Sequence, residues 1–246
     1  MSKKLLLGVN IDHIATLRQA RLEKFPSVIR AAKACEQAGA GQITVHLRED
    51  RRHIQDKDVF ELKKILSGKL NLEMACYDEI INIACKLRPH QATLVPEKRR
   101  ELTTEGGLDV IKNFRAVSGT VDRLQKKRIT VSLFIDPDLE QVEMALRTGA
   151  EFIELHTGSF ANAASESKAQ KELLKLIDAS VFARALGLGV NAGHGIDYNN
   201  IKSILKIPHM HELNIGFSII AEAVFTGLDK AVRKMIKLMR QYRGVS

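Results

Sequence analysis

Tryptophan is absent from the 246-residue chain, and aromatic residues make up only 5% of it. Proteins that bind single-stranded nucleic acid stack bases on aromatic side chains, so a stacking platform is not expected here. Cysteine is also scarce: Cys35, Cys76 and Cys85 contain no Cys-x-x-Cys pair. An odd and sparse set of cysteines excludes a disulfide framework and disfavours a zinc knuckle. We therefore expect a protein of the reducing cytoplasm.

Long apolar runs are missing as well, so no segment is expected to cross a membrane. The start MSKKLLLGVNID has two lysines ahead of an apolar run, but the run is too short for a secretory signal and lacks a small-residue cleavage site. It predicts a first β-strand. The basic segment Leu228–Arg243 would suit a membrane surface, but its apolar residues form one stripe. The stripe predicts packing on the protein and consists of Ala231, Met235, Leu238 and Tyr242.

The chain has a net charge of +9 and an ordinary globular balance of 45% hydrophobic and 27% charged residues. Nucleic acid, a membrane surface or an anionic small molecule could each account for the charge. The basic residues are scattered over several segments and do not form one stripe. We therefore favour an anionic small molecule and expect neither nucleic acid nor membrane as a partner.

Segments typical of strands and helices alternate along the whole chain. Strands are predicted at 4–12, 42–47, 69–75, 91–96, 129–136, 151–158, 188–193 and 211–220. Helices are predicted at 25–40, 56–68, 77–89, 108–127, 137–150, 167–187, 197–206 and 221–243, with Asp138 and Asp197 as expected N-caps. Eight such units in 246 residues predict a single-domain TIM (β/α)8 barrel over residues 1–246. An open doubly wound sheet is the alternative, but no Gly-rich G-x-G-x-x-G turn follows the first strand.

Polar residues occupy one face of most predicted strands, although parallel strands are usually apolar on both faces. Because side chains alternate along a strand, these residues point the same way on each strand. They are Asn10, Asp12, Thr44, His46, Arg48, Asn71, Glu73, Glu154, His156, Asn191, Glu212 and Asn214. One interpretation is a satisfied buried network that fixes strand register. The other, which we favour, is an active site at the carboxyl ends of the barrel strands.

Within that site, His46 is a candidate acid or base and Arg48 a candidate anion ligand. The Gly-containing loops Asn191–Gly195 and Asn214–Ser218 follow the seventh and eighth strands, where barrels commonly bind phosphate. A second anion site is expected at Arg48, His53 and the loop 97–107, which has the composition of a closing lid or of an ordinary solvated loop. No lysine lies on an inward face near a strand end, which disfavours an enzyme-bound Schiff base.

One alternative function uses the same barrel for metal-dependent isomerisation or epimerisation of a sugar phosphate. His46, Glu73, Glu154 and His156 come from three strands and could gather around a metal ion. No local H-x-x-E-H pair supports this alternative.

Six long segments occur in order along the chain: GVNIDHIATLRQAR, ITVHLREDRRHI, NLEMA, LVPEKRRELTTEGGLDV, IELHTG and GVNAGHG. Together they resemble the signature segments of the pyridoxine 5′-phosphate synthase family, nearly end to end. The resemblance implies a TIM barrel with extra helices, assembled as an octamer. It also implies condensation of 3-amino-2-oxopropyl phosphate with 1-deoxy-D-xylulose 5-phosphate to give pyridoxine 5′-phosphate, phosphate and water. No metal or organic cofactor is implied.

The resemblance also assigns roles to particular positions. His46 and Glu73 match proton acceptors, His194 matches a proton donor and Glu154 matches a residue that stabilises a transition state. Contacts with the aminoketone phosphate are implied for Asn10, Arg21, Gly195, Gly216 and Phe217. Contacts with the deoxyxylulose phosphate are implied for Asp12, His13, Arg48, His53 and Thr103. The family usually has histidine at position 217, so at Phe217 only a backbone contact with phosphate is expected.

Overall fold

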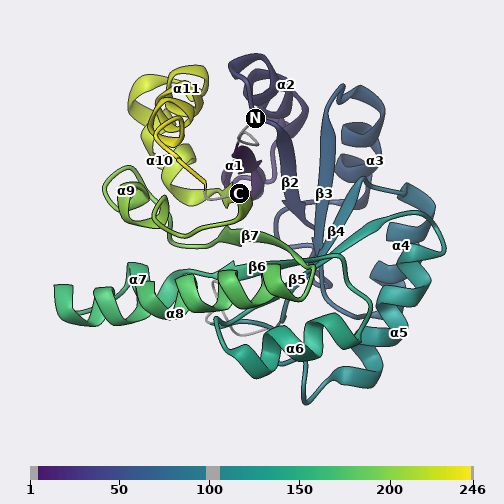
Figure 1. Cartoon of the computed structure of the whole chain (residues 1–246). Coiled ribbons are helices and arrows are strands. Elements are labelled where there is room, and N and C mark those ends of the chain that lie inside the picture. The colour runs from purple at the N-terminus through teal and green to yellow at the C-terminus, as the bar shows by residue number, and fades with distance from the viewer. Residues whose placement is uncertain (1–4, 98–105, 245–246) are drawn as a thin grey trace.

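The computed structural model describes residues 5–97 and 106–244, and its strands close into a parallel barrel (Figure 1). Each strand pairs with the next along the chain, and β1 pairs with β8. The strands are β1 (Leu6–Asn10), β2 (Gln42–His46), β3 (Lys69–Met74), β4 (Gln91–Leu94), β5 (Thr130–Ile135), β6 (Phe152–His156), β7 (Gly189–Gly193) and β8 (Met210–Ile215). The predicted TIM barrel is confirmed.

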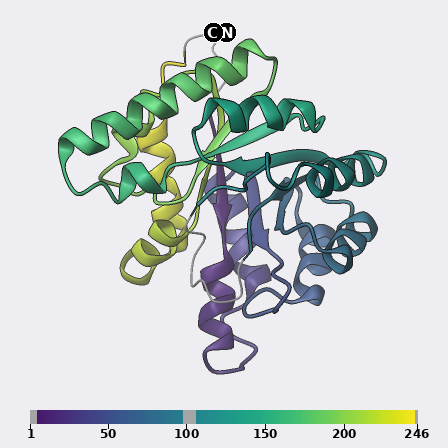
Figure 2. The same ribbon diagram turned by 90° about the horizontal axis from the view of Figure 1, so that it is seen from below.

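Helices surround the barrel, as the two perpendicular views show (Figures 1 and 2). They are α1 (Asp12–Gln19), α2 (Val28–Ala38), α3 (Asp56–Ile65), α4 (Asp78–Leu87), α5 (Phe114–Gln125), α6 (Leu139–Arg147), α7 (Gly158–Ala161), α8 (Glu166–Ala185), α9 (Ile201–Ile204), α10 (Phe217–Thr226) and α11 (Leu228–Met239). Helices α1 and α7 lie in segments for which no helix was predicted. Helix α1 is short and polar, so its sequence lacks the long apolar stripe that indicates an amphipathic helix.

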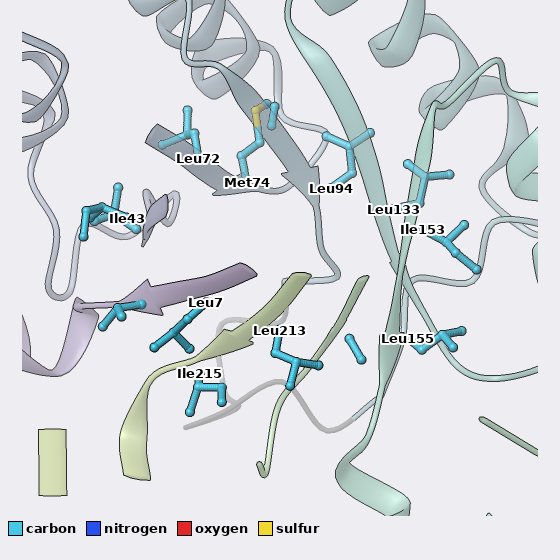
Figure 3. Close-up of a cluster of buried hydrophobic side chains, with 14 of the residues drawn as sticks. Leu7, Ile43, Leu72, Met74, Leu94, Leu133, Ile153, Leu155, Leu213 and Ile215 are labelled. Carbon is cyan, nitrogen blue, oxygen red and sulfur yellow. The ribbon is translucent and has the colours of Figure 1, made fainter. Parts of the chain in front are cut away.

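The apolar faces of the strands pack outward against the helices. Figure 3 shows this layer with ten labelled side chains, among them Leu7, Ile43, Met74 and Leu155. The polar faces point inward, where hydrogen bonds cross between strands: Asn71 Nδ2 donates to Thr44 Oγ1, for example. The inward direction predicted for the polar faces is therefore confirmed.

Three predicted elements have boundaries that differ from the structure. Asp12 is not a strand residue but the first residue of α1, because the Asn10 side chain accepts its backbone N–H and turns the chain. The last strand ends at Ile215 and α10 begins at Phe217, so the predicted strand 211–220 is too long. The predicted helix 221–243 is divided at Gly227, whose φ of +86° is disfavoured for other residues.

The remaining helix predictions hold with shorter bounds. The predicted N-cap Asp138 accepts the backbone N–H groups of Glu140 and Gln141 and begins α6. Asp197 accepts the N–H groups of Asn199 and Asn200 in a turn, and only Ile201–Ile204 is helical in the predicted segment 197–206. No helix within the described ranges is long and apolar enough to span a membrane.

Candidate functional site

Residues from β1, α1, β2 and β3 form a hydrogen-bonded cluster at the carboxyl ends of the strands. The Asn10 amide nitrogen Nδ2 donates to Asp12 Oδ2 at 2.8 Å and to Glu73 Oε2 at 3.3 Å. The other carboxylate oxygen of Asp12, Oδ1, accepts the backbone N–H of His46 at 2.9 Å. These contacts bring four of the predicted site residues to one side of the barrel mouth.

The carboxyl groups of this cluster hold protons more tightly than free carboxyl groups do. Burial raises the pKa of Asp12 from 3.8 to about 7, against the opposing effect of the hydrogen bonds from His46 and Asn10. Burial also raises the pKa of Glu73 well above 4.5, and the nearby carboxylates of Asp12 and Glu154 raise it further. A carboxyl group with a raised pKa, as Asp12 has, can both accept and return protons during a reaction.

Glu154 lies on the β6 side of the mouth and is held by Asn214 of β8. Asn214 Nδ2 donates to Glu154 Oε2 at 2.7 Å, and Asn214 Oδ1 accepts from Thr44 Oγ1 at 3.0 Å. Burial raises the pKa of Glu154 from 4.5 to about 8. Gly193 of β7 leaves room for this carboxylate, since a Cβ there would lie 2.2 Å from Glu154 Oε1. The network therefore reaches across the barrel from β2 to β6.

His46 and His53 lie beside each other, with ring centroids 6.2 Å apart. Burial lowers the pKa of His46 from 6.5 to about 3, and the pKa of His53 to about 4. Both rings are thus neutral at neutral pH. His46 Nε2 is buried and has no hydrogen-bond partner within the described part of the chain. A neutral imidazole at the mouth suits the role of a base.

Arg48 follows the end of β2 and is held by two acidic side chains. Its Nε lies 3.3 Å from Glu97 Oε1 and 3.3 Å from Asp50 Oδ1. The Glu97 side chain is almost fully buried, and it also accepts the backbone N–H of Glu49 at 3.0 Å. Glu97 begins the predicted loop 97–107, but no role of its own was predicted for it. The sequence could have indicated Glu97 as a site residue, because it follows the fourth predicted strand directly after Pro96.

The loops after β7 and β8 lie next to each other. Ser218 Oγ, in the first turn of α10, donates to the backbone oxygen of Ile196 at 2.7 Å. His194 and Gly195 both have positive φ, at +73° and +78°. Gly216 precedes α10 and its backbone oxygen accepts the N–H groups of Ile219 and Ile220, which leaves the N–H groups of Phe217 and Ser218 at the start of the helix. Glycine and a helix N-terminus together make a suitable place for a phosphate group.

His194 is a partly buried imidazole of this region. Burial, with a smaller contribution from the neighbouring His156, lowers its pKa from 6.5 to about 4. Its ring centroid lies 5.0 Å from that of His156. His194 is therefore neutral at neutral pH unless a negative charge is brought beside it.

Three further predicted residues have different outcomes. The Phe217 ring is 69% exposed, and it meets the His13 ring edge-on with centroids 5.3 Å apart. Arg21 lies exposed in the turn after α1, and none of the described contacts joins it to the mouth. Thr103 and most of the predicted closing loop 97–107 lie outside the described residues.

A further pair joins His156, which was predicted on the inward polar face, to Asp136, which was not predicted as part of the site. His156 Nδ1 lies 2.9 Å from Asp136 Oδ1, and the His156 ring is 4% exposed. Phe134 packs against this ring with centroids 5.1 Å apart. The strand alternation placed His156 on the inward face, but an acidic partner from the next strand is not visible in one sequence.

The proposed metal ligands of the isomerase alternative do not gather. Within residues 5–97 and 106–244, no group of three or more His, Cys, Asp or Glu side chains is arranged to hold a metal ion. The geometry thus gives the metal-dependent alternative no support.

A closed parallel barrel with ionisable carboxyl groups and neutral imidazoles at its mouth defines an enzyme that works by acid–base catalysis. The model of the family described as pyridoxal phosphate biosynthesis protein PdxJ matches residues 7–241 of the chain. Pyridoxine 5′-phosphate synthase from Geotalea daltonii is 53% identical over 234 residues, which are 95% of this chain and 98% of that protein. The chain belongs to the PdxJ family, the pyridoxine 5′-phosphate synthases of vitamin B6 biosynthesis.

Solved structures with low sequence identity show the same fold. A form of phosphoribosylanthranilate isomerase from Thermotoga maritima matches with a TM-score of 0.62 and 12% identity, covering 96% of this chain and 98% of that one. The corresponding isomerase from Thermus thermophilus matches with a TM-score of 0.60 and 13% identity, covering 97% of this chain and 100% of that one. At such low identity the likeness shows the barrel fold alone.

Proposed function

We propose that the barrel mouth condenses 3-amino-2-oxopropyl phosphate with 1-deoxy-D-xylulose 5-phosphate, giving pyridoxine 5′-phosphate, inorganic phosphate and water. The observation that carries the proposal is the carboxyl cluster of Asp12, Glu73 and Glu154, whose pKa values are all raised by burial. Ring formation requires imine formation, loss of phosphate, addition of water and dehydration. Each of these steps moves protons, and groups that titrate near neutrality move them best.

Glu73 is the proposed acceptor of carbon-bound protons. It sits among other carboxyl groups, and Asn10 Nδ2 donates a hydrogen bond to it. This hydrogen bond favours the ionised form that accepts a proton, while burial favours return of the proton afterwards. His46 is the proposed second acceptor, for hydroxyl or water groups, since its Nε2 has no partner within the described ranges. Glu154 is proposed to stabilise a transition state from the opposite side.

The two phosphate groups are proposed to bind at two ends of the mouth. Gly195, Gly216 and the backbone N–H of Phe217 suit the aminoketone phosphate, with Asn10 and Arg21 as further contacts. Arg48, His53 and His13 suit the deoxyxylulose phosphate, together with Asp12 and Thr103. His194 is the proposed proton donor to the departing phosphate. A phosphate dianion beside this imidazole raises its pKa and so favours the protonated form.

We also propose that residues 1–246 act as one catalytic domain, without metal or organic cofactor, in the cytoplasm as a homo-oligomer. Large apolar side chains are exposed on and after α1 and on α10, and these two helices contact each other. The most exposed are Leu22, Phe217, Val224 and Phe225. Apolar surface of this extent supports burial against a second copy of the chain. The octamer itself rests on the family resemblance, and light scattering would measure the assembly mass.

The experiment that tests the reaction is a direct assay. Purified, chelator-treated protein is mixed with both phosphorylated substrates, and pyridoxine 5′-phosphate and free phosphate are followed together. Equal amounts of the two products are expected, and none from a Glu73→Gln variant. If neither product forms, with or without added divalent metal, the proposed reaction is wrong.

A further inference from the structure

Asp136 and His156 form a polar pair beside the proposed site. The ring nitrogen Nδ1 of His156 lies 2.9 Å from Asp136 Oδ1, at the ends of β6 and β5. The hydrogen bond from His156 lowers the pKa of Asp136 below 3.8, so this carboxyl group is ionised and acts as an acceptor only. The shared hydrogen is therefore on Nδ1 of His156.

The other ring nitrogen of His156 has no place for a hydrogen. Nε2 is buried and has no acceptor within the described residues. A Cβ built on Gly158 would lie 2.4 Å from it, so the backbone of α7 packs closely against this atom. A proton on Nε2 would be buried without a partner, which is costly. The surroundings thus favour a hydrogen on Nδ1 of His156, facing Asp136, and offer no acceptor for one on Nε2 within the described residues.

This ring lies against His194, the proposed proton donor. The two ring planes meet at 64° with centroids 5.0 Å apart, and the Gly158 position borders both rings. The neighbouring Thr157 donates its Oγ1 hydrogen bond to the backbone oxygens of Gly193 and His194. Residues 156–158 therefore hold both the backbone and the ring of His194, whose positive φ needs such support.

We propose that His156, held by Asp136 through its Nδ1–H group, is a positioning residue that orients the His194 ring. The inference rests on the proposed role of His194, but the state of His156 can be measured independently of activity.

The first test is neutron diffraction from crystals of the deuterated full chain. The expected result is a deuterium on His156 Nδ1. A ring without a deuterium on Nδ1 overturns the proposal. This result does not depend on which substrates the enzyme uses, so it is separate from any failure of the proposed reaction.

The second test compares two variants at the same position, assayed with both substrates. His156→Asn keeps an N–H donor for Asp136 but lacks the ring, and His156→Phe keeps a ring but lacks the donor. We expect kcat to fall 10- to 100-fold in both, as for other residues that orient a functional histidine, with KM within about threefold of the starting value. Full kcat in either variant overturns the proposal.

A matched control is His211→Asn, because the His211 ring also packs on a phenylalanine, Phe152, with centroids 5.4 Å apart. His211 lies in the first half of β8, at the other end of the barrel. The kcat of His211→Asn is expected to stay within about twofold of the starting value. If the two His156 variants do not fold, Asp136→Ala is the variant that tests the proposal. Asp136 is exposed, and without its carboxylate the His156 ring is no longer held through Nδ1. A fall in kcat of at least about tenfold supports the proposal, and a smaller one overturns it.

Discussion

Asn10 Nδ2 donates a hydrogen bond to Glu73 Oε2 across 63 positions of the sequence. The same amide nitrogen also donates to Asp12, so one donor is shared by two buried carboxyl groups. Asn10 therefore opposes part of the pKa rise that burial causes in both of them, and that the carboxylates of Asp12 and Glu154 increase in Glu73. The balance between these effects sets the pH range in which Glu73 can accept a proton.

Glu73→Gln is expected to lower kcat roughly 100- to 10,000-fold, because a positioned base contributes about this much. The measurement is the rate of product formation at saturating concentrations of both substrates. Glu212→Gln is the matched control, since Glu212 also lies inside the barrel but in the middle of β8. Activity above about one tenth of the starting value in Glu73→Gln would contradict the assigned role.

Asn10→Ala is expected to move the acidic limb of the kcat/KM profile to higher pH. Without this donor the ionised form of Glu73 loses a hydrogen bond, so its pKa rises further and less of the base is ionised at a given pH. The pH dependence of kcat/KM reports groups of the free enzyme and is the measurement to use. An unchanged acidic limb would show that Glu73 does not control it.

Binding of an anion is expected to be accompanied by proton uptake at His194. The pKa of His194 is about 4 without ligand, and a negative charge beside the ring raises it. Sulfate is a suitable probe because it does not titrate near neutrality. Calorimetry at pH 6 in two buffers with different ionisation enthalpies measures the number of protons taken up. His194→Asn should remove this uptake, and equal uptake in the variant would assign the proton to another group.

The barrel and most of its mouth could be predicted from the sequence because both depend on local patterns. Strand alternation places Glu73 and Glu154 on the inward face, and capping chemistry identifies Asp138. The pairing of Asp136 with His156 could not be predicted in this way, because it joins two strands whose register is set by the closed barrel. Helix α1 was missed for a related reason: Asn10 begins it through a side-chain contact, and tertiary packing then supports a weakly amphipathic sequence.

The buried carboxyl group of Glu212 is expected to make the protein less stable as the pH rises. Burial raises its pKa from 4.5 to about 7, with a smaller opposing effect of Lys69. Between these two values the folded state keeps a proton that the unfolded chain releases. The free energy of unfolding therefore falls with rising pH, by up to about 1.4 kcal/mol per pH unit for this group.

Glu212→Gln should remove this contribution, because the amide does not ionise and its oxygen can still accept the hydrogen bond from Gln42 Nε2. The measurement is the difference in unfolding free energy between the variant and the starting protein from pH 4.5 to 7. This difference is expected to grow in favour of the variant as the pH rises. A difference that stays constant over the window would contradict the raised pKa.

Arg18 and Asp58 form a buried ion pair that supports the segment carrying His53. Arg18 Nη1 and Nη2 each donate to Asp58 at 2.8 Å, and Nη2 also donates to the His53 backbone oxygen at 3.0 Å. The two side chains are only 8% and 5% exposed. Removing one partner of such a pair leaves a charge buried without compensation, which costs about 3–5 kcal/mol.

Asp58→Ala is therefore expected to lower the free energy of unfolding by about 3–5 kcal/mol, measured by denaturant unfolding at one fixed protein concentration. Glu143→Ala is the matched control, because its ion pair with Arg147 is about half exposed and should contribute at most about 1 kcal/mol. Asp58 also accepts the N–H of Gln55, two residues beyond His53, so its loss frees this segment. KM for the deoxyxylulose phosphate should then rise more than KM for the aminoketone phosphate. Equal destabilisation by Asp58→Ala and Glu143→Ala would contradict this prediction. It would mean that the cost of desolvating Arg18 and Asp58 cancels their attraction. The pair would then only fix the position of His53.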